Sequence, residues 1–272
     1  MINMRIDNKN IVLDDLDRKI IHQLDINSRQ STAEISKKVS SNKDTVNYRI
    51  NKLLENSVIK RFSVAINTSK FGYQNIKVYF QFQNFSKEVE KEFFDYLQSI
   101  PRIGWVVRAS GRWDALFCYW AKSSFEFYSV FIKILNKFSK YIYHKEIVHN
   151  INWFYYNRKW IDRKDSKIYP ILYGEKPGNE KLDDLDTTIL ERLIDNAKIP
   201  IKDIAFETNQ SAQTVINRIK GLKNRGIITK FGIDLNYEKL GLLFCKTFVY
   251  LDNITKKRLD ELYDYCAKQP NI

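Results

Sequence analysis

The chain has 272 residues with 44% hydrophobic side chains, which is enough for about two domains with ordinary cores, and no apolar run reaches the ~20 residues that span a bilayer. Its formal net charge of +13 suits a polyanionic partner such as nucleic acid. The stretch from Met1 to Asn10 is polar and lacks the apolar segment of a signal peptide, so we expect a cytoplasmic protein.

The residues that usually carry catalysis or metals form no recognisable set. Cys118, Cys245 and Cys266 make no C-x-x-C pair and no cluster with histidine, so we interpret them as reduced thiols rather than metal ligands or disulfides. No P-loop, Ser-His-Asp set or metal-ligand spacing is present. We therefore expect no cofactor, no metal and no enzymatic activity.

The first predicted module, residues 1–66, begins with three short helices. Apolar residues at helical spacing from Leu16 to Leu24 predict a helix that starts at Asp14 or Asp15. The segment Ser31 to Glu34 fits a capping box that opens a second helix. After a short polar turn, Asn42 is positioned to cap a third. Two helices joined by a tight turn are typical of a helix-turn-helix.

The third helix has one apolar and one polar face. Val46, Ile50 and Leu53 lie at helical spacing and are expected to face inward. The polar side chains suited to base edges and phosphates are Asn42, Lys43, Asp44, Thr45, Asn47, Tyr48, Arg49 and Lys52. Residues 59–64 are expected to form a β wing. These features predict a winged helix-turn-helix that binds double-stranded DNA, and predict that Arg49→Ala weakens binding.

Residues 67–161 are predicted to form an α/β module. Strands and helices alternate as strand, helix, strand, strand, helix, strand, over residues 76–83, 89–100, 103–109, 113–121, 127–138 and 141–153. This order is the ferredoxin-like βαββαβ pattern. The sheet face without helices would carry Tyr79 and Trp105 or Trp120, so we expect it to pair with another sheet by dimerisation.

The chain then leaves this module through an aromatic stretch. Trp153, Phe154, Tyr155, Tyr156 and Trp160 could be a base-stacking or cofactor site, but packing of the tail against the body is the favoured interpretation. Pro170, Gly174, Pro177 and Gly178 mark residues 162–181 as a linker.

A second copy of the first module follows at an offset of 169 residues (182 − 13). Residues 13–17 recur as 182–186, and 19 of the 60 pairs between 13–72 and 182–241 are identical. The repeat unit is a whole domain pair, longer than a solenoid period of roughly 20–50 residues. In the second copy, residues 182–235, the polar side chains assigned to DNA are Ser211, Gln213, Thr214, Asn217, Arg218 and Lys220.

The second copy of the body is incomplete. Residues 236–272 offer one predicted strand, about Leu242 to Leu251, and one helix, about Thr255 to Ala267. One strand and one helix cannot bury their apolar faces alone, so either the sequence is truncated or this half-body packs against the first body or against another chain; we favour truncation.

The net charge does not distinguish the two predicted helix-turn-helix modules, which we call the heads. Residues 13–62 carry ten Lys/Arg and seven Asp/Glu, which gives +3, and residues 182–231 carry eight and seven, which gives +1. The basic excess is spread along the chain. Docking of the heads on protein rather than DNA therefore stays open as an alternative.

In combination, the Leu13–Asp17 start, the helix-turn-helix, the Val58–Phe62 wing and the βαββαβ body resemble the Lrp/AsnC (feast/famine) transcription regulators. The resemblance implies an α+β fold of winged helix-turn-helix domains with a ferredoxin-like (RAM/ACT-like) domain. It further implies a homodimer or higher homo-oligomer on palindromic double-stranded DNA, and a small effector, commonly an amino acid. The third helix begins Asn42-Lys43-Asp44 rather than the family's frequent Ser-Pro-Thr, so base preference does not transfer.

The resemblance also points to an effector site. The family uses a Gly-x-x-Asp hairpin turn, which Gly111 and Asp114 match here. Turn amides would hold a carboxylate and the Asp an ammonium; a plain hairpin Asp is the alternative. The runner-up function is a sirohaem decarboxylase-like enzyme, which has a similar architecture. Against it, the wing lacks histidine, and His144 and His149 have the wrong parity to share a strand face.

Overall fold

The computed structural model describes residues 11–271 apart from 152, 157, 163–170 and 175. The polar segment Met1 to Asn10 and the expected linker residue Pro170 lie outside the described residues. Two units are present: the head unit comprises described residues of 1–66, 155–171 and 182–272, and the body unit comprises those of 67–154 and 172–181. No helix in the described part of the chain is long and apolar enough to cross a membrane.

The first head contains the three predicted helices, α1 (Asp15–Ile26), α2 (Thr32–Lys38) and α3 (Lys43–Glu55). Each begins where its sequence cap predicts. Asp14 and Ser31 form capping boxes with the third helical residue, and the Asn42 carboxamide oxygen accepts the amide of Thr45 at 2.7 Å. Three caps within about 30 residues define the short helices that local propensity alone would leave marginal.

The second head repeats this arrangement with α6 (Asp184–Asp195), α7 (Ile201–Glu207) and α8 (Ala212–Asn224). Asp183 caps α6 and Ser211 caps α8, in register with the first head. Pro200 precedes α7 without a side-chain cap, because proline carries no hydrogen-bonding side chain. The ungapped sequence repeat is therefore a structural repeat as well.

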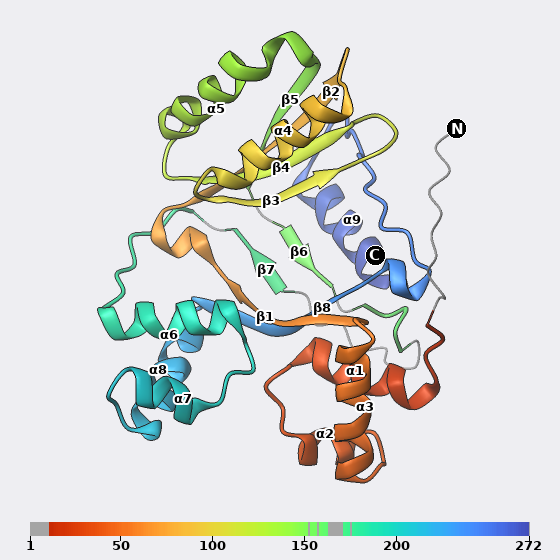
Figure 1. The fold of residues 1–272 in the computed structure, drawn as a ribbon, viewed down its shortest axis with the longest axis vertical. Helices are drawn as coiled ribbons and strands as arrows, with labels where there is room; N and C mark the ends of the chain where they lie inside the picture. The colour runs from red at the N-terminus through yellow and green to blue at the C-terminus, as the bar shows by residue number, and fades with distance from the viewer. Residues whose placement is uncertain (1–10, 152, 157, 163–170, 175, 272) are drawn as a thin grey trace. The chain divides into compact units, whose positions relative to one another are not determined.

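The predicted wing strands are confirmed as β1 (Ile59–Ile66) and β8 (Ile228–Leu235). The two strands come from different heads and pair with one another in an antiparallel two-stranded sheet (Figure 1). Helix α1 packs against β8, and α6 packs against β1. Ile233 and Leu235 of β8 are buried in the core of the first head. The second head therefore contributes side chains to the core of the first head across the sheet.

From Tyr155 onward the aromatic tail belongs to the head unit, so for this part the expectation that it packs on the body is wrong; Phe154 belongs to the body unit. Tyr155 begins the tail's part of the head unit, and Trp160 lies against the first head's core. The physical reason is a buried carboxylate: Asp25 is 1% exposed, and its Oδ1 binds Nη1 of Arg158 from the tail. The same oxygen lies 3.4 Å from Nζ of Lys230 and 3.3 Å from the hydroxyl of Tyr155.

Lys230 should give the head unit a pH dependence. Burial lowers the pKa of its ammonium to about 8, although Asp25 opposes the shift, whereas the unfolded chain keeps the ordinary value of 10.5. Between about pH 8 and pH 10 the unfolded state binds more protons, so the free energy of unfolding should rise with pH, by about 1–2 kcal/mol. Urea titrations across this window test the rise, and Lys230→Met should remove most of it. Tyr155, whose pKa burial raises, opposes the trend only above about pH 10.

The body unit is an antiparallel four-stranded sheet in the order β3-β4-β2-β5. Its elements follow the predicted βαββαβ order: β2 (Gln74–Phe82), α4 (Lys87–Ser99), β3 (Ile103–Arg108), β4 (Ala115–Ala121), α5 (Ser124–Phe138) and β5 (Ile142–Asn150). Alternate residues of β2, such as Ile76 and Phe80, share one apolar core with both helices. The register places Tyr79, Trp105 and Trp120 on the opposite face, as predicted.

Smaller elements complete the chain. The predicted strand 141–153 divides into β5 and β6 (Trp153–Tyr155), and β6 pairs with β7 (Ile171–Tyr173) in a short separate sheet. Within the described residues, 3₁₀ turns cover Thr68–Phe71, Ser139–Tyr141 and Glu238–Leu240. Cys118, Cys245 and Cys266 are free thiols.

The half-body forms only in part. Helix α9 (Lys256–Lys268) agrees with the predicted helix. The predicted strand at Leu242–Leu251 is wrong, since these residues have no strand structure and Leu243, Phe244 and Tyr250 are exposed. A strand needs a neighbouring strand to satisfy its backbone hydrogen bonds, and none of the described strands pairs with this segment.

Candidate nucleic-acid interface

Helices α3 and α8 each carry an exposed face on the side away from their buried Val and Ile residues. Val46, Ile50 and Leu53 of α3 are buried, as are Val215, Ile219 and Leu222 of α8. The predicted site residues that are exposed are Asn42, Lys43, Asp44, Asn47, Tyr48, Lys52, Ser211, Gln213, Asn217 and Lys220. Tyr48 is 61% exposed, so its ring is available for contact with a partner.

Thr45, Arg49, Thr214 and Arg218, the predicted site residues that both copies share, are only half-buried. Arg49 binds the start of α1: its Nη1 lies 2.5 Å from Asp14 and 3.2 Å from Asp17. The hydrogen bond from the amide of Asp17, with help from Arg49, holds the pKa of the Asp14 carboxyl below its usual value. Arg49 therefore fastens the recognition helix to the first helix of its own head.

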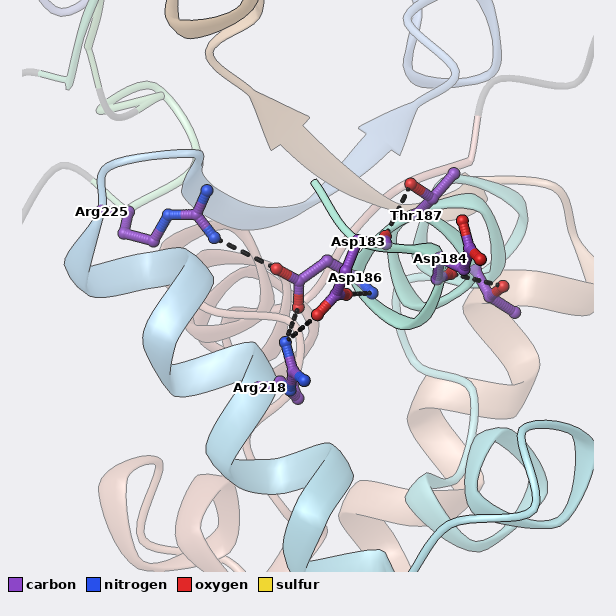
Figure 2. A network of polar contacts seen from close by, with 7 residues as sticks. Asp183, Asp184, Asp186, Thr187, Arg218 and Arg225 are labelled. Carbon is purple, nitrogen blue, oxygen red and sulfur yellow. Dashed lines mark hydrogen bonds and ion pairs between the residues drawn. The ribbon is translucent and has the colours of Figure 1, made fainter. Parts of the chain in front are cut away.

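The second head repeats this clamp with one addition. Arg218 lies 2.6 Å from Asp183 and 3.3 Å from Asp186, and Arg225 adds a 3.1 Å contact to the 6%-exposed Asp186 carboxylate. Figure 2 shows both guanidinium groups converging on the N-terminus of α6. The position equivalent to Arg225 in the first copy is Asn56, so only the second head has this extra pair.

A basic cavity of about 410 Å³ lies between the two heads, lined by residues 29–33, Lys43 and residues 198–200. Arg29 donates to the carbonyls of Ala197 at 2.7 Å and Ile199 at 3.2 Å, so its charge is fixed against the opposite head. Burial, with a smaller contribution from Arg29, lowers the pKa of the Lys198 ammonium. Lys43, the first residue of α3, joins this cavity to the recognition helix.

The candidate effector turn lies in the body unit between β3 and β4. Gly111 has a φ of +113°, a conformation that favours glycine. The Asp114 carboxylate accepts the amide of Phe82 at 2.7 Å, and Gln81 donates to the carbonyl of Arg112 at 2.7 Å. Asp114 thus ties the hairpin to β2, while Arg112 and Trp113 stack beside it with 5.2 Å between the guanidinium and the ring.

Comparison with known proteins identifies the family. A family model described as an AsnC-type helix-turn-helix domain matches residues 13–54 and 182–223. An uncharacterized HTH-type transcriptional regulator of Pyrococcus abyssi is 30% identical over 106 residues, which is 39% of this chain and 71% of that protein. The chain belongs to the Lrp/AsnC family of DNA-binding transcriptional regulators.

Two solved structures are similar to parts of this Lrp/AsnC regulator. An AsnC family regulator from Agrobacterium tumefaciens is 24% identical with a TM-score of 0.46, and the match covers 51% of this chain and 90% of that one. The sirohaem decarboxylase NirDL is 12% identical with a TM-score of 0.52, covering 81% of this chain and 65% of that one. At that identity the second match concerns the fold alone.

The sequence patterns placed the exposed faces of this regulator but did not reveal the partners of the arginines that both copies share. Arg49 and Arg218 recur at the 169-residue offset together with the Leu-Asp-Asp-Leu-Asp start. Because both copies keep the arginine together with the two aspartates, the sequence could have indicated an ion pair between them. The cross-head cavity had no such signal, because its residues come from two modules whose pairing the sequence did not predict.

Proposed function

We propose that this regulator binds duplex DNA through the exposed faces of α3 and α8 and responds to a small effector bound at its ferredoxin-like body. The observation that carries the DNA assignment is the pair of capped, solvent-exposed helix faces, each with amide and cationic side chains, in a chain of the Lrp/AsnC family. Amide groups suit base edges, and Lys43, Lys52 and Lys220 suit phosphates. The cavity beside Lys43 offers Arg29 and Lys198 as further phosphate contacts.

Lys52→Ala and Arg49→Ala should differ in which property they change: the first the salt dependence of DNA binding, the second the stability of the fold. Lys52 is exposed, so its loss should weaken binding on all duplexes, reduce the dependence of log K on log salt by about 1, and leave the melting temperature unchanged. Arg49→Ala should lower stability by about 1 kcal/mol or less, because it leaves Asp14 and Asp17 without their cation, and keep the salt dependence. Fluorescence anisotropy over a salt series and thermal melts separate the two.

A lower salt dependence for Arg49→Ala, equal to that of Lys52→Ala, would contradict this assignment and make Arg49 a phosphate ligand. Unchanged binding for Lys52→Ala together with an analogous Lys220→Ala would argue against the recognition faces altogether.

For the effector, we propose an amino acid at the turn of Gly111 and Asp114. The turn's backbone suits a carboxylate, and Asp114 supplies the charge that an ammonium needs. Asp114→Asn retains an oxygen that can accept the Phe82 amide but loses the charge, so it should abolish effector binding without unfolding the hairpin. Thermal shift and calorimetry with a pool of amino acids would test this; equal binding by the variant would exclude Asp114 as the ammonium ligand.

A sirohaem decarboxylase activity is the second candidate, favoured by the tandem fold match alone. The residues offer it little support. In β5, His144 pairs with Gln81 on the helix-free face, whereas His149 pairs with Ile76 on the face that α4 and α5 cover. Two histidines on opposite faces cannot hold one tetrapyrrole carboxylate cluster. An absorbance titration of the purified protein with sirohaem tests the activity, and no spectral change is expected.

A further inference from the structure

The pairing of β1 with β8 has an internal two-fold symmetry. Ser63 lies opposite Gly232, which is its own repeat equivalent because 63 + 169 = 232. On either side of this pair the partners exchange: Arg61 faces Asp234, and Ala65 faces Lys230. Each cross-strand pair thus recurs with its two repeat positions exchanged. Such exchange is typical of an isologous interface, which here forms within one chain.

Contacts outside the ladder obey the same symmetry. The amide of Ser28 donates to the carbonyl of Phe231 at 3.1 Å, and its repeat equivalent Ala197 donates to Phe62 at 3.3 Å. The guanidinium of Arg29 lies 5.7 Å from the Phe231 ring centre, and the equivalent Lys198 ammonium lies 4.8 Å from that of Phe62. With α1 on β8 and α6 on β1, the two heads form one two-fold pair.

The two recognition helices differ where they face solvent and agree where they face the core. Positions 45, 46, 49, 50 and 53 are identical in the second copy. The six exposed positions between Lys43 and Lys52 all differ: they are Lys43, Asp44, Asn47, Tyr48, Asn51 and Lys52, against Ala212, Gln213, Ile216, Asn217, Lys220 and Gly221. The two-fold pair of heads thus exposes two recognition-helix faces that differ in sequence.

We infer that a single chain binds two DNA half-sites, one with each head, and that its target is a duplex whose half-sites are inverted but not identical. The inference rests on the proposed DNA-binding function and specifies its partner. Inversion follows from the two-fold axis of the heads, and non-identity follows from the exposed positions. A second chain is not needed to complete the pair of half-sites, because β1 already has its partner in β8.

The test begins with selection of duplexes by the full chain, followed by native mass spectrometry of the complex. The expected motif is an inverted repeat with unlike halves L and R, bound by one chain for each pair of half-sites. Duplexes L–R, L–L and R–R are then compared by anisotropy. L–R should bind at least about tenfold more tightly than either palindrome, since each correct base contact contributes a factor of about 5–150.

A transplant of the reading face gives the sharper measurement. The exposed residues of α8 are replaced by those of α3 through Ala212→Lys, Gln213→Asp, Ile216→Asn, Asn217→Tyr, Lys220→Asn and Gly221→Lys. None of these positions is buried, and a Cβ at Gly221 would meet nothing within 4 Å, so the fold should persist. This variant should prefer L–L, and the reverse transplant into α3 should prefer R–R.

The outcomes separate the two levels of the proposal. A perfect palindrome as the selected motif, two chains for each pair of half-sites, or transplants that leave the L–R preference unchanged would overturn the inference while leaving DNA binding intact. Binding of no duplex in the selection would overturn the proposed function itself, and the inference with it.

Discussion

Asp25→Ala should lower the free energy of unfolding of the head unit by about 3–5 kcal/mol, the cost of leaving buried cations without their anion. The Asp25 carboxylate is 1% exposed and is shared by Arg158 of the tail and Lys230 of β8, whose side chains are only 15% and 10% exposed. Its removal leaves two positive charges in a site that water barely reaches. Urea unfolding followed by far-ultraviolet circular dichroism measures the loss.

Two controls separate burial from charge. Asp234→Ala removes the anion of a second ion pair that joins the heads, with Arg61, but both side chains are exposed, so we expect a change below about 1 kcal/mol. The triple variant Asp25→Leu, Arg158→Met, Lys230→Met removes all three charges and should recover most of the stability lost in Asp25→Ala. Equal losses for Asp25→Ala and Asp234→Ala would show that the cluster is solvated and that the burial argument is wrong.

The sequence was sufficient for what each module does locally. Caps at Asp14, Ser31 and Asn42 placed three helix starts, and alternation along β2 placed the covered face of the body sheet. These features depend on residues within a few positions of one another, where hydrogen-bond geometry and periodicity are decisive. The ungapped repeat then carried the same description to the second head.

Contacts between modules were beyond the sequence patterns. The pattern of residues 59–64 indicates a strand but does not say that its partner is 169 residues away in the repeat. The mismatch between Asp25 and its equivalent Ile194 was visible, yet only the structure shows that the tail supplies Arg158 as the partner of Asp25. At Leu242–Leu251 the predicted strand does not form, because an apolar segment does not show by itself whether a partner strand exists.

The shared arginines show the same limit for the site. Arg49 and Arg218 have the chemistry of phosphate ligands, and their retention in both copies favoured that role. Their guanidinium groups instead contact the carboxylates that start α1 and α6. Retention within a repeat reports what both copies need to fold as well as what they bind. In α3 and α8, the exposed positions that differ between the copies are therefore the better guide to recognition.

Ile233→Ala should destabilise the first head although Ile233 belongs to the second. Its side chain is 2% exposed and lies in the core that contains Ile20, Leu24 and Ile50 of α1 and α3. Truncation removes buried apolar surface and leaves a cavity, for an expected cost of about 2–5 kcal/mol. Hydrogen exchange by mass spectrometry should show faster exchange in α1 and α3 as well as in β8.

The repeat provides a matched control in Val64, the equivalent of Ile233 in β1. Val64 is only half-buried, so Val64→Ala should cost about 1 kcal/mol or less and leave exchange in α1 and α3 nearly unchanged. If Ile233→Ala accelerated exchange only in α6, α7, α8 and β8, the heads would be independent domains and the shared core would be wrong. If both heads respond together, the β1–β8 sheet is the element that makes one cooperative unit of two recognition helices, which is what a fixed spacing between half-sites on DNA requires.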